Sequence, residues 1–432
     1  MAQIKTETNN AETKGLMGWV DARLPVTSFV KAHLTEYYAP KNFNFWYFFG
    51  SLALLILVLQ IVTGIFLTMH YKPDAQQAFA SVEYIMRDVF GGNIIRYMHS
   101  TGASMFFVVV YLHMFRGLIY GSYRNPRELI WLFGVGIFLV LMGEAFFGYL
   151  LPWGQMSYWG AQVIVNLFAT IPFIGPDLSE WLRGDYLISD ATLNRFFAFH
   201  VIALPFVLAG LVAVHLVALH EVGSNNPDGI EIKANKDKKT GIPLDGIPFH
   251  PYYTVKDLVG VVVFLIVFAS ILFFAPEMGG YFIEANNFVP ADPLKTPAHI
   301  APVWYFTPYY SILRAVPPIF NSQFPGVAAM GLSVMIFALL PWLDKSPVKS
   351  IRYRGALYKK WLAAFVISFL VLGYLGTVPS NIWGQFGAWL GGADRATVVA
   401  RVFTIIYFAF FILMPWYTAK DKTKPVPERV TK

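Results

Sequence analysis

The chain has 432 residues, of which 56% are hydrophobic and 14% charged, and its mean hydropathy is +0.51. This composition is typical of a polytopic membrane protein and excludes an ordinary soluble domain. Cysteine is absent, which excludes disulfides, thiolate metal ligands, iron–sulfur ligation and covalent cofactor attachment through Cys-x-x-Cys-His in this chain. The net charge of +7 follows from membrane topology, as argued below, so we expect no nucleic-acid partner.

The N-terminal residues up to about Lys41 are polar and of mixed charge, with no apolar run near their start, so we expect no cleaved signal peptide. A bilayer core requires roughly 20 apolar residues in a helix. Eight runs of this kind follow, at about 44–70, 95–120, 129–150, 194–221, 255–275, 325–343, 359–378 and 400–417. The apolar segment 155–172 is broken by Gly160 and Pro172, which predicts helices within a loop. The sequence therefore predicts an all-α polytopic membrane protein with eight transmembrane helices.

An even number of spans places both termini on one side of the membrane. All but nine of the 33 lysines and arginines lie in the N-terminal segment, in the loops after the second, fourth and sixth spans, or in the C-terminal tail. The positive-inside rule then predicts that both termini are cytoplasmic. With the polar N-terminal segment, this pattern favours a bacterial inner membrane.

Two of the predicted spans carry two histidines each. His99 and His113 lie 14 residues apart, about 21 Å along a helix and within about 40° of one line. His200 and His215 lie 15 residues apart, about 60° off one line in a regular helix, so we expect a kink or bulge near Pro205 to absorb the extra residue. Because both spans run from the periplasmic side inward, His99 faces His200 and His113 faces His215. Each pair is suited to hold one six-coordinate haem iron for one-electron transfer.

A lone intramembrane histidine can pack helices by bonding to a carbonyl, but two matched pairs favour ligation. Gly50 and Gly64 in the first span are also 14 residues apart, as are Gly134 and Gly148 in the third. Glycine lets a backbone approach a flat macrocycle closely, although small-residue helix packing produces the same spacing.

Arg96 and Arg116 lie three residues outside the two histidines of the second span. There they can bind haem propionates or, equally, anchor the helix at the membrane interface. We expect the first four spans to form a haem-binding four-helix bundle. The predicted division of the chain is 1–43 (cytoplasmic N-terminal segment), 44–222 (di-haem bundle), 223–254 (cytoplasmic loop), 255–418 (four further spans with their connecting loops) and 419–432 (cytoplasmic tail).

Six longer motifs surround these positions. They are Arg96-Tyr-Met-His-Ser-Thr-Gly-Ala-Ser-Met-Phe-Phe107, Gly148-Tyr-Leu-Leu-Pro-Trp-Gly-Gln-Met-Ser-Tyr-Trp-Gly160, Arg195-Phe-Phe-Ala-Phe-His200, His220-Glu-Val-Gly-Ser-Asn-Asn-Pro227, Phe249-His-Pro-Tyr-Tyr-Thr-Val-Lys-Asp257 and Pro302-Val-Trp-Tyr305. Through them the chain resembles, over nearly its full length, the cytochrome b subunits of quinol–cytochrome c oxidoreductase (cytochrome bc1) complexes. Eight spans in one chain resemble the undivided form of that family.

This resemblance implies two non-covalent b-type haems, a low-potential one on His99 and His200 and a high-potential one on His113 and His215. It implies that quinol is oxidised near the periplasmic face. One electron then goes to a Rieske iron–sulfur protein and cytochrome c, and the other crosses both haems to reduce quinone near the cytoplasm. That is the Q cycle, which translocates protons. The implied partners are the Rieske protein, cytochrome c1, lipids and a second copy in a homodimer, with cytochrome c contacted indirectly.

The resemblance maps quinol oxidation onto Gly148, Tyr149, Met156, Gly160, Ile164, Pro302, Tyr305, Phe306 and Tyr310. It maps quinone reduction onto the inner ends of the first, fourth and fifth spans, at His220, Ser224, Lys256 and Asp257. Reduction needs proton donors at a water-accessible edge, a role open to His220 and Asp257, with Lys256 helping to supply them. Taken singly, the outer residues fit packing of loop helices equally well, and the inner ones fit interfacial polar positions.

At one position the chain departs from the family. Most members have Pro-Glu-Trp-Tyr, whose glutamate is thought to carry a quinol proton away, whereas this chain has Val303, which has no proton to exchange. We expect Glu144, a lone carboxyl one turn before Gly148 in an uncharged stretch, to have taken over this role. The alternative is a neutral carboxyl bonded to a backbone carbonyl.

Two other functions fit parts of the pattern. A proton-coupled transporter would use the buried histidines and Glu144 as a proton relay, and it predicts no b-type haem spectrum. A di-haem membrane anchor of another quinone-linked dehydrogenase would lack the outer quinol site. The Pro-Trp-Gly segment and Pro302–Tyr305 argue against that anchor.

Overall fold

The computed structural model describes residues 15–386 and 394–431. Within these residues, eight helices are long and apolar enough to cross a membrane. Their bounds are Phe45–Thr68, Gly92–Tyr120, Glu128–Leu150, Asp190–Val222, Tyr252–Phe274, Phe324–Leu343, Ala356–Thr377 and Arg395–Ile412. Each coincides with one predicted span, so the all-α architecture with eight spans is confirmed.

The elements follow one another along the chain as helices with two short strands. The first half contains α1 (Leu16–Asp21), α2 (Val26–Val30), α3 (Phe48–Thr68), α4 (Ala78–Arg87), α5 (Gly92–Tyr120), α6 (Glu128–Leu150), α7 (Gln155–Phe168), α8 (Gly175–Arg183), α9 (Asp190–Ala198) and α10 (Leu204–Val222). The second half contains α11 (Tyr252–Phe274), α12 (Thr307–Ala315), α13 (Phe324–Met335), α14 (Leu340–Leu343), α15 (Ala356–Thr377), α16 (Arg395–Ile412) and α17 (Met414–Lys420). The strands β1 (Tyr38–Pro40) and β2 (Gly246–Pro248) pair antiparallel.

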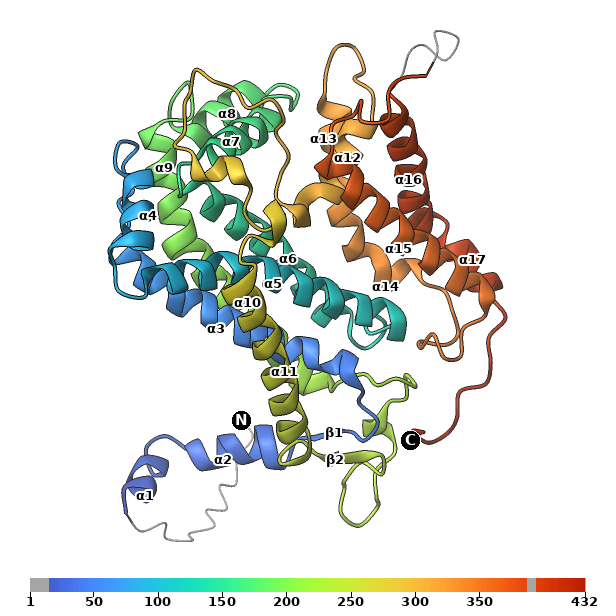
Figure 1. Ribbon diagram of the computed structural model, residues 1–432. Helices are drawn as coiled ribbons and strands as arrows, with labels where there is room; N and C mark the ends of the chain where they lie inside the picture. Colours follow the sequence, from blue (N-terminus) through green and yellow to red (C-terminus); the bar gives the residue numbers. More distant parts are fainter. Residues whose placement is uncertain (1–14, 387–393, 432) are drawn as a thin grey trace.

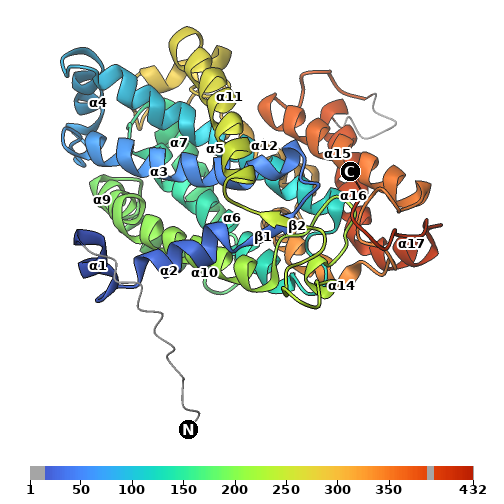
Figure 2. The ribbon, with the colours of Figure 1, turned by 90° about the horizontal axis from the view of Figure 1, so that it is seen from below.

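The spans form two groups that lie side by side (Figures 1 and 2). In the N-terminal group α3 packs on α5 and α6 packs on α10, which gives the predicted four-helix bundle. In the C-terminal group α12, α15 and α16 pack on one another. The fifth span, α11, packs against α3 and α5.

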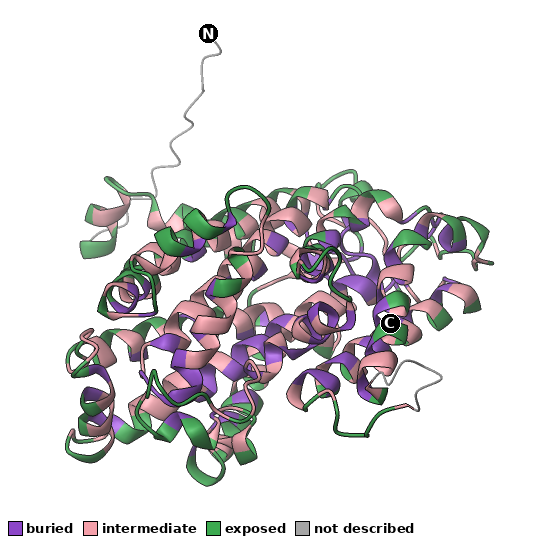
Figure 3. Ribbon diagram, turned by 90° about the horizontal axis from the view of Figure 1, so that it is seen from above, coloured by how far each residue is buried: buried purple, intermediate pink, exposed green. Residues whose placement is uncertain are grey.

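Aromatic and aliphatic residues form a buried core inside each group, and Figure 3 shows buried stretches of the ribbon in the interior. Phe107 and Phe138 are 1% exposed in the centre of the N-terminal group. By contrast, Val259, Val262 and Ile266 on α11 are at least half exposed. Apolar residues on the outer face of a spanning helix are what a lipid environment requires, so the burial pattern agrees with membrane insertion.

The segment 155–172 forms a helix within a loop, as expected, but the predicted break at Gly160 is wrong. α7 runs through that glycine, which weakens a helix without ending it. α7 ends at Phe168, ahead of Pro172, and α8 follows from Gly175. Figure 1 shows both at the end of the molecule opposite β1 and β2.

The N-terminal segment, the α10–α11 loop and the C-terminal tail meet at the β1–β2 end. Asp245 in the loop pairs with Lys41 at 2.8 Å and with Arg429 at 2.8 Å. Asp228 in the same loop accepts a bond from the backbone N–H of Thr431 at 2.9 Å. These contacts join three distant parts of the chain at one end of the bundle.

Candidate functional site

Four histidines from two long helices face one another in two pairs inside the N-terminal bundle. The ring centroids of His99 and His200 are 6.0 Å apart, and those of His113 and His215 are 6.5 Å apart. Because a histidine nitrogen lies about 2 Å from a metal that it binds, two rings on opposite sides of one metal have centroids about 6 Å apart. Both pairs therefore have the separation expected of two histidines that would hold one metal between them.

A one-turn π-helix, Phe199–Ala203, interrupts the helix that carries His200 and His215. Such a turn accommodates one extra residue within a helix. Pro205 follows in the first turn of α10, where a proline is tolerated. The π-helix lets the 15-residue spacing on this helix match the 14-residue spacing on α5, so the predicted distortion near Pro205 is confirmed.

Hydrogen bonds define the tautomer of the first pair of rings. The Thr63 hydroxyl lies 2.7 Å from the carbonyl oxygen of Leu59 and 2.9 Å from Nδ1 of His99. Its single proton goes to the carbonyl, so it accepts a bond from Nδ1–H of His99. Nδ1 of His200 lies 2.9 Å from the carbonyl oxygen of Glu144, which can only accept. In both rings Nε2 keeps a free lone pair, the form that binds a metal.

The four predicted glycines each face the ring of one of these histidines. We measured from a Cβ atom placed on each glycine to Cε1 of the facing ring. The distances are 3.4 Å for Gly50 and His113, 3.3 Å for Gly64 and His99, 3.5 Å for Gly134 and His215, and 2.4 Å for Gly148 and His200. A side chain at Gly148 would therefore displace the ring. The glycines leave room beside all four rings.

Two half-buried arginines, each with one buried guanidinium nitrogen, flank the histidines of α5. Nη1 of Arg96 and Nε of Arg116 have no hydrogen-bond partner among the described residues. The Arg116 guanidinium carbon lies 5.2 Å from the ring centroid of Tyr47. Buried cations without acceptors are costly, and a carboxylate on a bound group would satisfy them.

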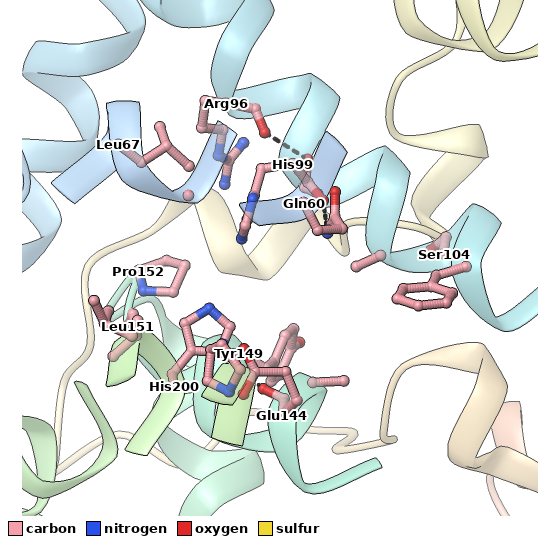
Figure 4. Close-up of a pocket in the computed structure, with 18 of the residues that line it drawn as sticks. Gln60, Leu67, Arg96, His99, Ser104, Glu144, Tyr149, Leu151, Pro152 and His200 are labelled. Atoms are coloured by element: carbon pink, nitrogen blue, oxygen red, sulfur yellow. Dashed lines mark hydrogen bonds and ion pairs between the residues drawn. The ribbon is translucent and has the colours of Figure 1, made fainter. Parts of the chain in front are cut away.

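A cavity of about 300 Å³ extends between α3, α5, α6 and the π-helix, with His99 and His200 pointing into it from opposite sides (Figure 4). Gly64, Gly148 and Arg96 also line it. Among residues 15–386 and 394–431, no cluster of three or more His, Asp or Glu side chains is placed to hold a bare metal ion. Paired histidines, an open cradle and cations without acceptors fit a b-type haem: His99 and His200 would hold it, Arg96 would bind its carboxylates, and it would supply one-electron chemistry.

The same cavity reaches the segment expected to oxidise quinol. Val303 and Tyr305, each 4% exposed, line it together with Glu144 and Tyr149. The Tyr305 ring stacks on Phe107 with centroids 3.9 Å apart. The fold thus brings residues from two distant parts of the chain into one wall.

The remaining residues expected at the quinol wall do not line this cavity. Gly160 lies behind Tyr149, where an added Cβ would be 3.6 Å from Cε1 of that ring. The guanidinium carbon of Arg314 lies over the Tyr310 ring, 4.8 Å from the centroid of that ring. The residues outside the lining are Met156, Gly160, Ile164, Pro302, Phe306 and Tyr310.

Two carboxyl groups approach the wall from different elements. One carboxylate oxygen of Glu144 lies 3.1 Å from Nδ1 of His200, so this side chain contacts a predicted ligand. Glu284, in the loop after α11, accepts a hydrogen bond of 2.6 Å from the Tyr149 hydroxyl. Burial raises the pKa of Glu284, and the bond from Tyr149 opposes that effect. The sequence does not reveal this pairing, since no local signal links α6 to that loop.

At the opposite end, the residues expected to reduce quinone lie at the C-terminal end of α10 and the N-terminal end of α11. Tyr37 joins two of them, with its ring 4.7 Å from that of His220 and its hydroxyl 3.3 Å from that of Ser224. Asp257 is half-buried, whereas Lys256 is exposed beside the ring of Tyr253. No hydrogen bond or ion pair joins Asp257 or Lys256 to His220.

Sequence reasoning missed Tyr37 and His33, whose ring lies 5.2 Å from that of His220. The cluster of aromatic residues just before the first span was the available signal. It lies outside the apolar runs from which the spans are predicted. Contact with His220 arises only when the N-terminal segment folds back under α10.

Comparison with known proteins agrees with this geometry. Residues 34–223 match the family model described as cytochrome b/b6/petB, and residues 290–408 match that described as cytochrome b(C-terminal)/b6/petD. Cytochrome b of Allochromatium vinosum is 64% identical, covering 98% of this chain and 100% of its own length. Cytochrome b of Rickettsia prowazekii is 47% identical with the same coverage. A solved chain of a hyperthermophilic respiratory complex III is similar, with a TM-score of 0.81 and 38% identity over 94% of this chain and 99% of that one.

Eight spans and paired histidines inside the bundle, together with these matches, define a multi-pass membrane cytochrome, a haem-binding protein of respiratory electron transport. Relatives of this similarity and coverage settle the family. The chain belongs to the cytochrome b family.

Proposed function

We propose that the chain is the di-haem cytochrome b of a complex III, or bc1, type respiratory complex, a quinol–cytochrome c reductase. The observation that supports this is the two pairs of facing histidine rings in one bundle. The ring centroids are 6.0 Å apart in one pair and 6.5 Å apart in the other. His99 and His200 would hold the low-potential b-type haem, and His113 and His215 the high-potential one. When bound, the two haems supply one-electron carriers at two depths of the membrane.

Quinol oxidation belongs at the wall that shares a cavity with the first histidine pair. Tyr149 and Tyr305 offer hydroxyl groups there, while Phe107 and Val303 make the surroundings apolar. A mostly apolar pocket with a few oriented polar groups is typical of a site for a hydrophobic ring. Met156, Gly160, Ile164, Pro302 and Tyr310 would complete the site around this wall.

Quinone reduction belongs at the inner ends of α10 and α11. His220, Ser224 and Asp257 would bond the quinone carbonyls and donate protons, with Lys256 helping to supply them. The contacts of Tyr37 with His220 and Ser224 support a polar, partly shielded position at this end of the bundle. The exposed Lys256 lies where it can exchange protons with water.

We also propose Glu144 as a proton acceptor at the quinol wall in place of Val303. Its support is its position in the cavity lining beside Tyr149. The test is Glu144→Gln, for which we expect unchanged haem spectra and slower quinol oxidation. An unaltered rate across pH would exclude this role.

The absence of cysteine requires another subunit to carry an iron–sulfur electron acceptor. We assign that role to a Rieske protein, followed by cytochrome c1 and then cytochrome c, in a Q cycle run by a homodimeric complex. The chain would lie in a bacterial inner membrane with both termini cytoplasmic. Its division at 1–43, 44–222, 223–254, 255–418 and 419–432 follows from that topology.

The decisive experiment is purification of the complex from membranes, followed by redox-titrated difference spectra and a quinol–cytochrome c reductase assay. We expect two b-type components with different potentials and activity sensitive to inhibitors of the outer quinol site. A proton-coupled transporter would show no b-type band. A di-haem anchor of another dehydrogenase would show the band without that sensitivity.

A further inference from the structure

The quinol wall lacks the acid found in most of the family, yet a quinol must lose protons to be oxidised. Val303 is buried and cannot accept a proton. The wall therefore needs another group that takes up a proton from the cavity and releases it to water. Such a group must contact the cavity wall and must also have access to solvent.

Tyr149 and Glu284 satisfy these conditions together. Tyr149 lines the cavity near the end of α6, and its hydroxyl donates to the Glu284 carboxyl at 2.6 Å. Ile283, the residue before Glu284, is 4% exposed and also lines the cavity. Ala285, the residue after it, is exposed. Glu284 thus stands where the cavity wall meets the molecular surface.

Glu144 lies differently. Its carbonyl and carboxylate oxygens both approach Nδ1 of His200, at 2.9 and 3.1 Å, and its second carboxylate oxygen is buried without a partner among the described residues. These contacts orient the His200 ring. Glu144 can accept a proton at the wall, as proposed above, but none of these contacts leads to water, so the wall still needs an exit.

We propose that Tyr149 and Glu284 form a proton exit from the quinol-oxidising wall, an inference that rests on the proposed quinol oxidation. The quinol O–H bond breaks as its proton bonds to the Tyr149 oxygen, and the tyrosine's own proton bonds to the Glu284 carboxylate. The carboxylic acid then releases that proton to water, and the second quinol O–H proton leaves by the same route once the carboxylate is restored. The two electrons of the quinol leave to one-electron acceptors, an iron–sulfur centre of a partner subunit and a b-type haem.

The electrostatics of the pair agree with this role. The titratable groups facing the Glu284 carboxyl are Tyr149 from α6 and Tyr305 from the turn Trp304–Phe306. Burial raises the pKa of the carboxyl, which brings it closer to the working pH, where a proton acceptor is most effective. Below its pKa the carboxyl is already protonated, so the rate should fall on the acid side.

The test uses the purified complex with Glu284→Gln, which keeps an acceptor for the Tyr149 hydroxyl but cannot take up a proton. We expect quinol oxidation to slow roughly a hundredfold, with unchanged haem spectra and potentials and no acid-side limb in the pH profile. Tyr149→Phe should slow the reaction similarly, and the double variant should be no slower than either single one. Glu284→Asp should restore part of the rate.

Glu277→Gln is the matched control, because Glu277 in the same loop accepts a bond from Tyr97 at 3.3 Å and neither residue lines the cavity. It should keep the parental rate. A parental rate and pH profile in Glu284→Gln, in an otherwise active complex, would overturn the exit while leaving the proposed function intact. Absence of quinol oxidation or b-type haem in the parental complex would instead overturn the proposed function.

Discussion

Replacing Thr63 by valine tests whether the bundle is built to hold a haem iron through a defined histidine tautomer. The substitution keeps the shape of the side chain but removes the hydroxyl that accepts the 2.9 Å bond from Nδ1–H of His99. The N–H is then left buried without a partner. The His113–His215 pair is untouched and serves as an internal reference.

The size of the effect follows from that one bond. An unsatisfied buried donor costs about 1–3 kcal/mol, and loss of an outer-shell partner typically lowers metal affinity about 10–100-fold. The bond also makes the imidazole a stronger electron donor, which favours the oxidised iron. If about 1 kcal/mol of the loss falls on the oxidised state alone, the midpoint potential rises by roughly 40 mV.

The assay is a redox titration of the b-type absorbance bands in purified complex, with Thr63→Ser as the control that retains a hydroxyl. We expect the midpoint potential of the low-potential component alone to rise, and we expect this haem to be lost more readily on dilution. An unchanged potential in Thr63→Val, or an equal shift of both components, would refute the tautomer argument.

Three further outcomes follow from the structure. His113→Ala should remove one of the two proposed b-type haems and leave the proposed low-potential one, as counted by pyridine haemochrome. Gly148→Ala places a Cβ 2.4 Å from Cε1 of His200 and should abolish the low-potential haem. Gly134→Ala, at 3.5 Å from its facing ring, should perturb its own haem less. Burial alone would raise the pKa of Asp245, but hydrogen bonds from an arginine and a lysine hold it at about 2, below its ordinary 3.8. Its stabilisation is therefore complete above about pH 4 and lost as pH falls through 2, and Asp245→Asn should loosen the C-terminal tail at neutral pH, measured by hydrogen exchange.

The sequence alone determined the eight spans and the positions of the four histidines. Spans are readable because a bilayer imposes a length and an apolar composition on each helix separately. The extra residue between His200 and His215 was equally readable, since a 15-residue spacing cannot match a 14-residue one without a local distortion. The π-helix Phe199–Ala203 supplies that distortion.

Only the tertiary structure decided which polar groups meet. Thr63 is an ordinary residue of an apolar helix until α3 packs on α5 and places its hydroxyl beside His99. Glu284 is one of several acidic residues in a loop until that loop folds against Tyr149. Hydropathy and spacing describe each helix alone, whereas a hydrogen bond between distant segments depends on how the helices are rotated and packed, which no single segment encodes.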